Sequence, residues 1–116
     1  MDTPGGPPPD LHLERNDEVP EIVRLAVTGE IDMTTGESFK RTLTAILDEP
    51  DVRRLLLDFT GLRFLDSNGV TVLVKTLQVT EERGVFFGIV NAPPAIRSVL
   101  EMLGVYQLLA ADEPAF

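Results

Sequence analysis

Cysteine is absent from the 116-residue sequence, and histidine occurs once, at His12. Without cysteine the chain can form no disulfide, no zinc–thiolate site and no thiol nucleophile. A lone histidine next to a Pro/Gly-rich stretch is a poor candidate for a metal site or a catalytic triad. The sequence also has no GxGxxG loop and no Walker-type lysine loop. We therefore expect no metal, no cofactor and no catalytic residue, and the chain is not expected to be an enzyme.

Basic residues are scarce as well: ten lysines and arginines stand against nineteen acidic residues, which gives a net charge of −9. Such a chain is not attracted to nucleic acid or to an anionic membrane, so its partners are expected to be proteins. No apolar run approaches the ~18 residues of a membrane span. The N-terminus has neither the basic region nor the apolar core of a signal peptide. We expect a cytoplasmic monomer.

The length of the chain fits one domain with a single hydrophobic core. Proline and glycine dominate the first nine residues, which indicates a disordered leader over residues 1–10. The domain itself is expected to span residues 11–110. Residues 111–116 are predicted to be a flexible tail.

Hydrophobic periodicity predicts strands that alternate with helices. Strands are expected over residues 11–15, 21–28, 54–59, 85–90 and 105–109, and helices over residues 35–48, from about 67 to 83, and 94–102. Thr34 and Glu37 fit a capping box before the first helix, and Thr60–Arg63 fits a turn. The resulting order, ββαβαβαβ, predicts an α/β fold with a mixed, mostly parallel sheet and an antiparallel edge.

The segment Asp66-Ser67-Asn68-Gly69 presents a hydroxyl group where the second helix is predicted to begin. The first turn of a helix offers unpaired N–H groups and a partial positive charge, so a phosphate on Ser67 would be well received. Serine is also a preferred N-cap residue, and a capping serine with no other role is the alternative. Sites in such sheets form beyond the carboxyl ends of the strands, which places Asp32 near Asp66 and Ser67.

Two motifs follow one another along this pattern of elements: Gly29-Glu30-Ile31-Asp32, and Leu55-Leu56-Leu57-Asp58 with Phe64-Leu65-Asp66-Ser67-Asn68-Gly69. Together they resemble the STAS domain of bacterial anti-sigma factor antagonists, over roughly residues 11–109. The resemblance implies that Ser67 is phosphorylated, that Asp32 and Asp66 flank it, and that Gly69 opens the helix. Asn68 stands where that family usually has Ser or Thr, and Val70 replaces a leucine. All five neighbours of Ser67 are expected to surround the phosphosite or contact a partner.

The resemblance also implies a function. In that family the unphosphorylated antagonist binds an anti-sigma factor with serine-kinase activity and thereby frees the sigma factor. Phosphorylation of the serine switches the antagonist off, and a phosphatase resets it. We therefore expect this kinase and a phosphatase as protein partners. The alternative is a STAS accessory or scaffold module of a stress-signalling or transporter complex, which binds a partner without a phosphoswitch.

Overall fold

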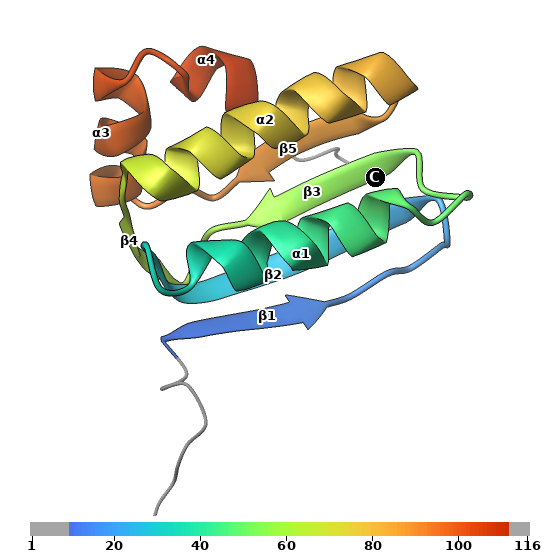
Figure 1. Ribbon diagram of the computed structural model, residues 1–116, viewed down its shortest axis with the longest axis horizontal. Helices are drawn as coiled ribbons and strands as arrows, with labels where there is room; N and C mark the ends of the chain where they lie inside the picture. Colours follow the sequence, from blue (N-terminus) through green and yellow to red (C-terminus); the bar gives the residue numbers. More distant parts are fainter. Residues whose placement is uncertain (1–9, 112–116) are drawn as a thin grey trace, which may run out of the picture.

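The computed structural model describes residues 10–111, which form a five-stranded sheet and four helices (Figure 1). The elements in chain order are β1 (Leu11–Arg15), β2 (Ile22–Ile31), α1 (Gly36–Leu47), β3 (Arg54–Asp58), β4 (Leu62–Leu65), α2 (Ser67–Arg83), β5 (Phe86–Val90), α3 (Pro94–Met102) and α4 (Tyr106–Leu109). Residues 1–9 and 112–116, most of the expected leader and tail, lie outside the described residues. No helix in residues 10–111 is long and apolar enough to cross a membrane.

The sheet is mixed and mostly parallel, which confirms the predicted fold class. β1 pairs antiparallel with β2, whereas β2 pairs in parallel with β3 and with β4, and β3 with β5. The strand order is β1-β2-β3-β5, with β4 beside β2. Ala26 lies between Glu14 and Asp58, and Gly29 lies between Leu11 and Leu62. β3 and β4 therefore follow one another along the same edge of the long strand β2.

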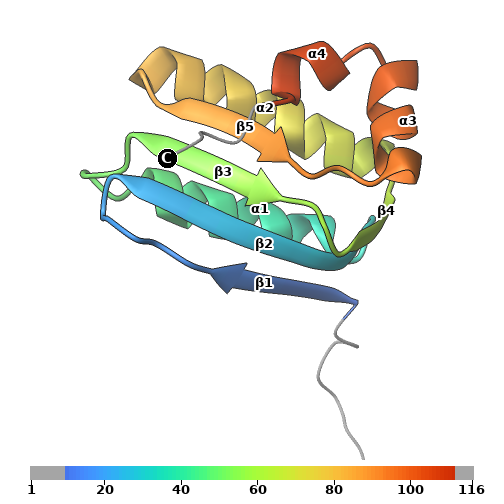
Figure 2. The same ribbon diagram turned by 180° about the vertical axis from the view of Figure 1, so that it is seen from behind.

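α1 and α2 lie side by side on one face of the sheet, in front of the strands in Figure 1 and behind them in Figure 2. Each helix turns an apolar stripe toward the strands, as the periodicity predicts. Leu43 of α1 is 1% exposed and Leu73 of α2 is fully buried. The core between the helices and the sheet also includes Val23, Leu25, Val27, Phe39, Leu55, Leu57, Phe59 and Ile89. This packed layer fixes where the first turn of α2 lies.

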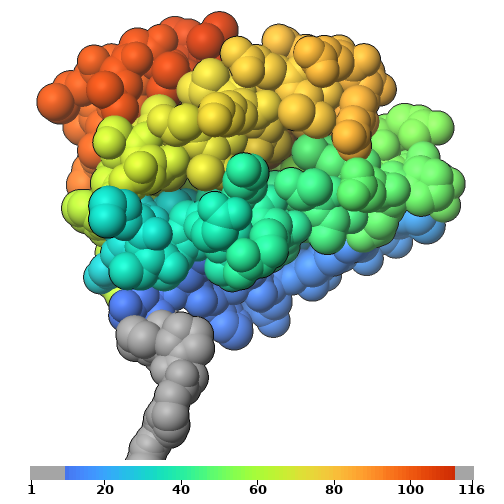
Figure 3. Space-filling view, in the orientation of Figure 1, coloured from blue at the N-terminus to red at the C-terminus, as the bar shows by residue number. Residues whose placement is uncertain are grey.

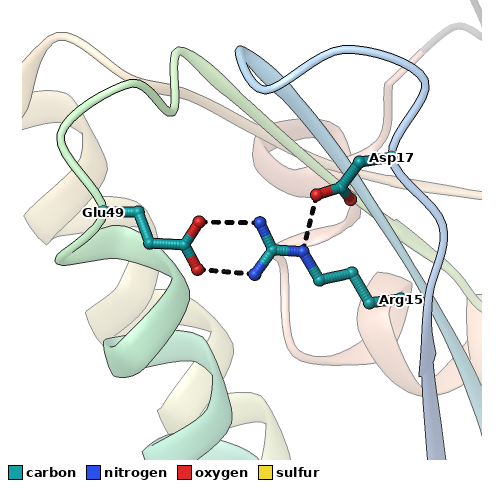
Figure 4. A network of polar contacts seen from close by, with 3 residues as sticks. All are labelled: Arg15, Asp17 and Glu49. Atoms are coloured by element: carbon teal, nitrogen blue, oxygen red, sulfur yellow. Dashed lines mark hydrogen bonds and ion pairs between the residues drawn. The ribbon is translucent and has the colours of Figure 1, made fainter.

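Arg15 ties the antiparallel edge strand to the loop after α1 (Figure 4). Its guanidinium donates hydrogen bonds of 2.5 and 2.7 Å to the carboxylate of Glu49 and one of 2.6 Å to Asp17. Bidentate arginine–carboxylate pairs are among the stronger polar contacts, and this one holds the pKa of Glu49 below its ordinary value. The contact lies at the end of β2 opposite to Ile31.

The sequence predicts a turn over Thr60–Arg63, but the turn is shorter and Leu62 already begins strand β4. Gly29 pairs with Leu62 and Glu30 pairs with Phe64, so Arg63 is an extra residue that bulges out of the ladder. The bulge breaks the alternation of buried and exposed side chains, and only Leu62 and Leu65 of this strand are buried. Because Leu62–Leu65 is short and its buried and exposed residues do not alternate, its sequence does not show the pattern that identifies a strand.

The strand predicted over residues 105–109 is wrong, because Tyr106–Leu109 form the short helix α4. Gly104 has φ +74°, which reverses the chain after α3. Leu109 is then fully buried while Leu108 is exposed. Strand-like pairing starts only at Ala110, in a parallel bridge to Ile89. A mostly apolar segment of five residues is too short for its period to distinguish a strand from a helical turn.

Two residues adjacent to the predicted domain form backbone hydrogen bonds with strands of the sheet. The carbonyl of Asp10 accepts a hydrogen bond of 2.6 Å from the Glu30 N–H, and the Ala111 N–H donates one of 2.9 Å to the carbonyl of Ile89. The order of elements over residues 10–111 is ββαββαβαα. It differs from the predicted ββαβαβαβ by the additional strand β4 and by the helix α4 in place of the last strand.

Candidate functional site at the start of α2

The candidate site forms where β2 and β4 end together. Ile31 pairs with Leu65, and the Asp66 N–H donates a hydrogen bond of 3.1 Å to the carbonyl of Ile31. The next residue of each chain segment is an acid of one of the two motifs, Asp32 after β2 and Asp66 after β4. The structure therefore brings together the two loops that the sequence predicts to meet.

Asp66, and not Ser67, caps helix α2. Its backbone is extended, with φ −100° and ψ −178°, and its Oδ1 accepts a hydrogen bond of 3.0 Å from the Gly69 N–H. Its carbonyl accepts the first helical bond, 3.1 Å from the Val70 N–H. These are the backbone and side-chain contacts of an N-cap residue. The alternative that Ser67 serves as the cap is therefore wrong, and Ser67 is the first residue of the helix.

The hydroxyl of Ser67 is exposed and has no hydrogen-bond partner among residues 10–111. The backbone carbonyl of Ser67 is engaged, since it accepts a hydrogen bond of 2.9 Å from the Thr71 hydroxyl. Within residues 10–111, the backbone N–H groups of Ser67 and Asn68 also have no hydrogen-bond acceptor. An uncommitted hydroxyl thus stands beside two free donors at the positive end of a helix, which is a favourable place for an anion.

Asp32 is held by its own loop. Its Oδ1 accepts hydrogen bonds from the hydroxyl of Thr34 at 2.7 Å, from the Thr34 N–H at 2.9 Å and from the Thr35 N–H at 3.1 Å. The bond from the Thr34 hydroxyl is the main reason that the pKa of Asp32 lies below its ordinary value. Asp32 is therefore a fixed negative charge beside the start of α2.

The capping box expected from Thr34 and Glu37 is wrong, because the Thr34 hydroxyl binds Asp32 and Thr34 is not the N-cap residue of α1. The residue before α1 is Thr35, whose side chain makes no capping hydrogen bond to that helix. Its hydroxyl donates instead to the carbonyl of Glu30 at 2.9 Å. The Asp32 carboxylate recruits the donors of this loop, because it accepts more strongly than a neutral hydroxyl.

Gly69 and Val70 support the site from beneath. Val70 is only 6% exposed and packs in the core, so it influences a partner only through the position of α2. A Cβ atom on Gly69 would lie 2.5 Å from Leu65 Cδ1 and 2.7 Å from Ile31 Cγ2. Glycine at this position therefore lets the first turn of α2 approach the ends of β2 and β4. Asn68 is exposed, and its amide donates a hydrogen bond of 3.4 Å to Asp66 Oδ2.

Two exposed apolar side chains close to the motif acids were not singled out from the sequence. Met33, directly after Asp32, is 79% exposed, and Phe64, two residues before Asp66, is 47% exposed. Apolar residues exposed beside a polar site are typical of a surface that another protein covers. Met33 could have been identified from the sequence, because an apolar side chain in a short polar loop is expected to be exposed and thus available to a partner.

The family model described as the STAS domain matches residues 13–114. The chain belongs to the STAS domain family. Two curated relatives of this STAS protein are anti-sigma F factor antagonists. The one from Paenibacillus polymyxa is 23% identical over 76% of this chain and 74% of its own. The one from Lysinibacillus sphaericus is 24% identical over 90% and 92%.

Solved structures show the same fold. An anti-sigma factor antagonist from Mycobacterium paratuberculosis aligns with a TM-score of 0.76 at 25% identity, over 88% of this STAS chain and 86% of its own. The antagonist SpoIIAA in its unphosphorylated form aligns with a TM-score of 0.75 at 21% identity, over 88% and 90%. The phosphorylated form of SpoIIAA, a Bacillus cell fate determinant, aligns with a TM-score of 0.70 at 20% identity, over 89% and 92%.

Proposed function

We propose that this STAS protein is an anti-sigma factor antagonist that acts in the cytoplasm as a monomer. In its unphosphorylated form it binds an anti-sigma factor with serine-kinase activity, which releases a sigma factor. Phosphorylation of Ser67 ends the interaction, and a phosphatase restores it. The observation that carries the proposal is the hydroxyl of the exposed residue Ser67, which has no partner in residues 10–111 and directly follows the motif acid Asp66 at the start of α2. The anti-sigma factor antagonists among its relatives support the same role.

The modification is a phosphoryl transfer in which this chain supplies only the acceptor. The Ser67 Oγ attacks the γ-phosphorus of ATP held by the kinase, ADP leaves, and the hydroxyl proton passes to a base on the kinase. Because Asp66 and not Ser67 caps the helix, the transfer does not remove a hydrogen bond that α2 needs. The kinase can therefore modify a folded substrate.

The phosphate changes the charge of the binding surface. It adds about −1.5 to −2 charges at pH 7, next to carboxylates of Asp32 and Asp66 that are already fixed in place. The free N–H groups at the start of α2 offset part of the repulsion. A partner that packs over Ser67 would have to desolvate this dianion, which is costly without a matching cation. Loss of affinity for the kinase is the expected result.

The test begins with the kinase. The unmodified protein is used to capture proteins from an extract of its own cells, and the captured anti-sigma factor is recognised by ATP-dependent phosphorylation of the bait. Mass spectrometry then locates the phosphate, which is expected on Ser67. Ser67→Ala should bind the kinase without being modified, while Ser98→Ala, which removes an exposed serine of α3, should behave as wild type.

Affinity for the kinase is then measured for the wild type, Ser67→Ala, Ser67→Asp and the phosphorylated protein. A loss of ~1–3 kcal/mol on phosphorylation would lower affinity roughly 5–150-fold, and Ser67→Asp should show a smaller loss because it carries less charge. Equal affinities of the four folded proteins would refute the switch and leave a STAS accessory module. Phosphate on Thr71 or Thr60 would move the site but keep the class of function.

A further inference from the structure

A groove runs between α1 and α2 and begins at the candidate phosphosite. It encloses about 360 Å³, and Asp32, Met33 and Asn68 lie at its start. Figure 3 looks onto the face where the two helices meet. Facing stripes on the helices line the groove, from Lys40, Thr44 and Leu47 on α1 and from Val72, Lys75 and Val79 on α2. Steps of three and four residues keep each stripe on one side of its helix, so the groove follows both helices along their length.

The positive charges of the groove are unusual for a chain with a net charge of −9. Lys40 and Lys75 are the only lysines in the sequence, and both line the groove. Both are exposed, and neither forms an ion pair or a hydrogen bond within residues 10–111. Arg83 adds a third cation at the far end, where it donates to the carbonyl of Leu47 at 3.0 Å and to Asp48 at 3.3 Å. The carboxylates of the lining, Asp32 and Glu37, belong to the loop before α1 and its first turn.

The size and shape of the groove fit a segment of polypeptide. From Gly36 to Leu47 the α1 side is about 17 Å long at 1.5 Å per residue, which corresponds to roughly three turns of a docked helix. The lining combines the apolar side chains of Leu47, Val72 and Val79 with the two lysines. A helix with one apolar and one acidic side could satisfy both sets of groups at once.

We propose that the groove receives an acidic, amphipathic segment of the partner that covers Ser67. The inference rests on the proposed function for the identity of that partner, and on the charges of the groove for the chemistry of the segment. Unpaired lysines in an otherwise acidic protein select carboxylates over other surfaces by charge complementarity. They also give an acidic partner a way to approach a protein that would repel it elsewhere.

The position of the groove links docking to the switch. Asn68 borders both the groove and Ser67, so a phosphate on Ser67 adds negative charge at the end of the surface where the segment lies. The segment and the phosphate carry charge of the same sign. Phosphorylation therefore opposes docking as well as the contact directly over Ser67.

Zero-length coupling of amines to carboxylates by a carbodiimide tests the proposal directly. Apart from the α-amino group, Lys40 and Lys75 hold the only amines of this chain. In the complex with the purified kinase, amide bonds are expected between these lysines and Asp or Glu residues of one kinase segment. The Lys40→Arg, Lys75→Arg double variant keeps the charges, so it should still bind but lose these cross-links. A complex that forms without lysine cross-links to the kinase overturns the proposal.

Charge reversal supplies the matched binding test, made on the Ser67→Ala background so that phosphorylation plays no part. Lys40→Glu should weaken kinase binding roughly 5–30-fold, with a steep dependence on salt, because an ion pair becomes a repulsion. Arg41→Glu makes the same charge change one residue away, on an exposed side chain outside the groove, and should change affinity less than about twofold. Equal losses in the two variants would mean that only net charge matters, which contradicts a docking groove.

Other occupants give different results, and each of them overturns the proposal. Cross-links between copies of this chain, formed without the kinase, indicate a self-association surface. Protection of both lysines by ATP or inorganic phosphate alone indicates a site for a small anion. The proposed function fails separately: if Ser67 is never phosphorylated but the lysines still couple to one acidic segment of a captured partner, the groove remains and the switch does not.

Discussion

Replacing Gly69 with alanine tests whether the first turn of α2 is placed by close packing. The added Cβ would lie 2.5 Å from Leu65 Cδ1 and 2.7 Å from Ile31 Cγ2. These side chains are 3% and 0% exposed, so neither can move aside into solvent. The φ angle of Gly69 is not in the left-handed region. The cost of the substitution must therefore come from packing and not from backbone strain.

The magnitude follows from two opposing effects. Overpacking a core by one methyl group costs about 1–3 kcal/mol, and the crowding here comes from two core residues. Alanine in place of glycine in a helix returns up to ~1 kcal/mol through its better propensity. We expect a net loss of about 1–2 kcal/mol in the free energy of unfolding. The helix should also move outward, and Ser67 with it.

Gly36→Ala is the matched control, because Gly36 also lies in the first turn of a helix but has no neighbouring atom within 4 Å of the position that an added methyl group would take. It should be neutral or should stabilise the protein by up to ~1 kcal/mol. Urea unfolding followed by circular dichroism gives both values, and the rate of Ser67 phosphorylation reports the displacement of the hydroxyl. Equal changes in stability for the two variants would refute the reasoning, because crowding at Gly69 would then have no effect.

Three further changes test the core, the cap and the charges of the sheet. Leu73→Ala removes a fully buried side chain and should lower the free energy of unfolding, measured in urea, by ~2–5 kcal/mol. The control Gln78→Ala, at an exposed position, should lower it by less than ~0.5 kcal/mol, and a near-neutral result for Leu73→Ala would contradict the packing of α2 on the sheet. Asp66→Ala should cost ~0.5–2 kcal/mol as a lost N-cap, with Asp66→Asn closer to wild type, and equal losses would contradict the capping role. Burial opposes ionisation of Asp58, but hydrogen bonds from Thr60, Arg24 and Asn91 outweigh it and lower its pKa. Its stabilisation is therefore present above the ordinary pKa of about 4 and is lost as pH falls through the folded value, so the stability difference from Asp58→Asn should shrink below that pH.

The sequence was informative wherever one physical pattern governed a long element. The apolar spacing of Leu43 and Leu73 identified the buried faces of α1 and α2, and both residues are in the core. The positions of Asp32 and Asp66 after strands that end at one edge of the sheet predicted that the two loops meet, and the bond from the Asp66 N–H to the Ile31 carbonyl confirms it.

The details that sequence could not supply depend on contacts between distant segments. Strand β4 forms because Leu62 and Phe64 pair with Gly29 and Glu30 of β2 in a bulged register. The sequence around Leu62 does not indicate this pairing. The choice of Asp66 over Ser67 as the cap depends on the extended backbone of Asp66, which its bond to Ile31 holds in place. The groove could not be predicted either, since Lys40 and Lys75 are 35 residues apart and line the same groove only because α1 and α2 lie side by side on one face of the sheet (Figure 1).

The hydrogen bonds around Ser67 also determine what a phosphate can change. Asp66 is bound to Gly69 and to the end of β2, and Asp32 is bound to Thr34 and Thr35, so neither acid has to leave its loop for Ser67 to react. Within residues 10–111, the Ser67 hydroxyl and the first two N–H groups of α2 have no hydrogen-bond partner. A phosphate can use those donors without breaking an existing bond, because the cap and the helix do not depend on them. If the proposed switch operates, we therefore expect phosphorylation of Ser67 to change the outer surface beside the groove lysines and to leave the fold beneath it the same.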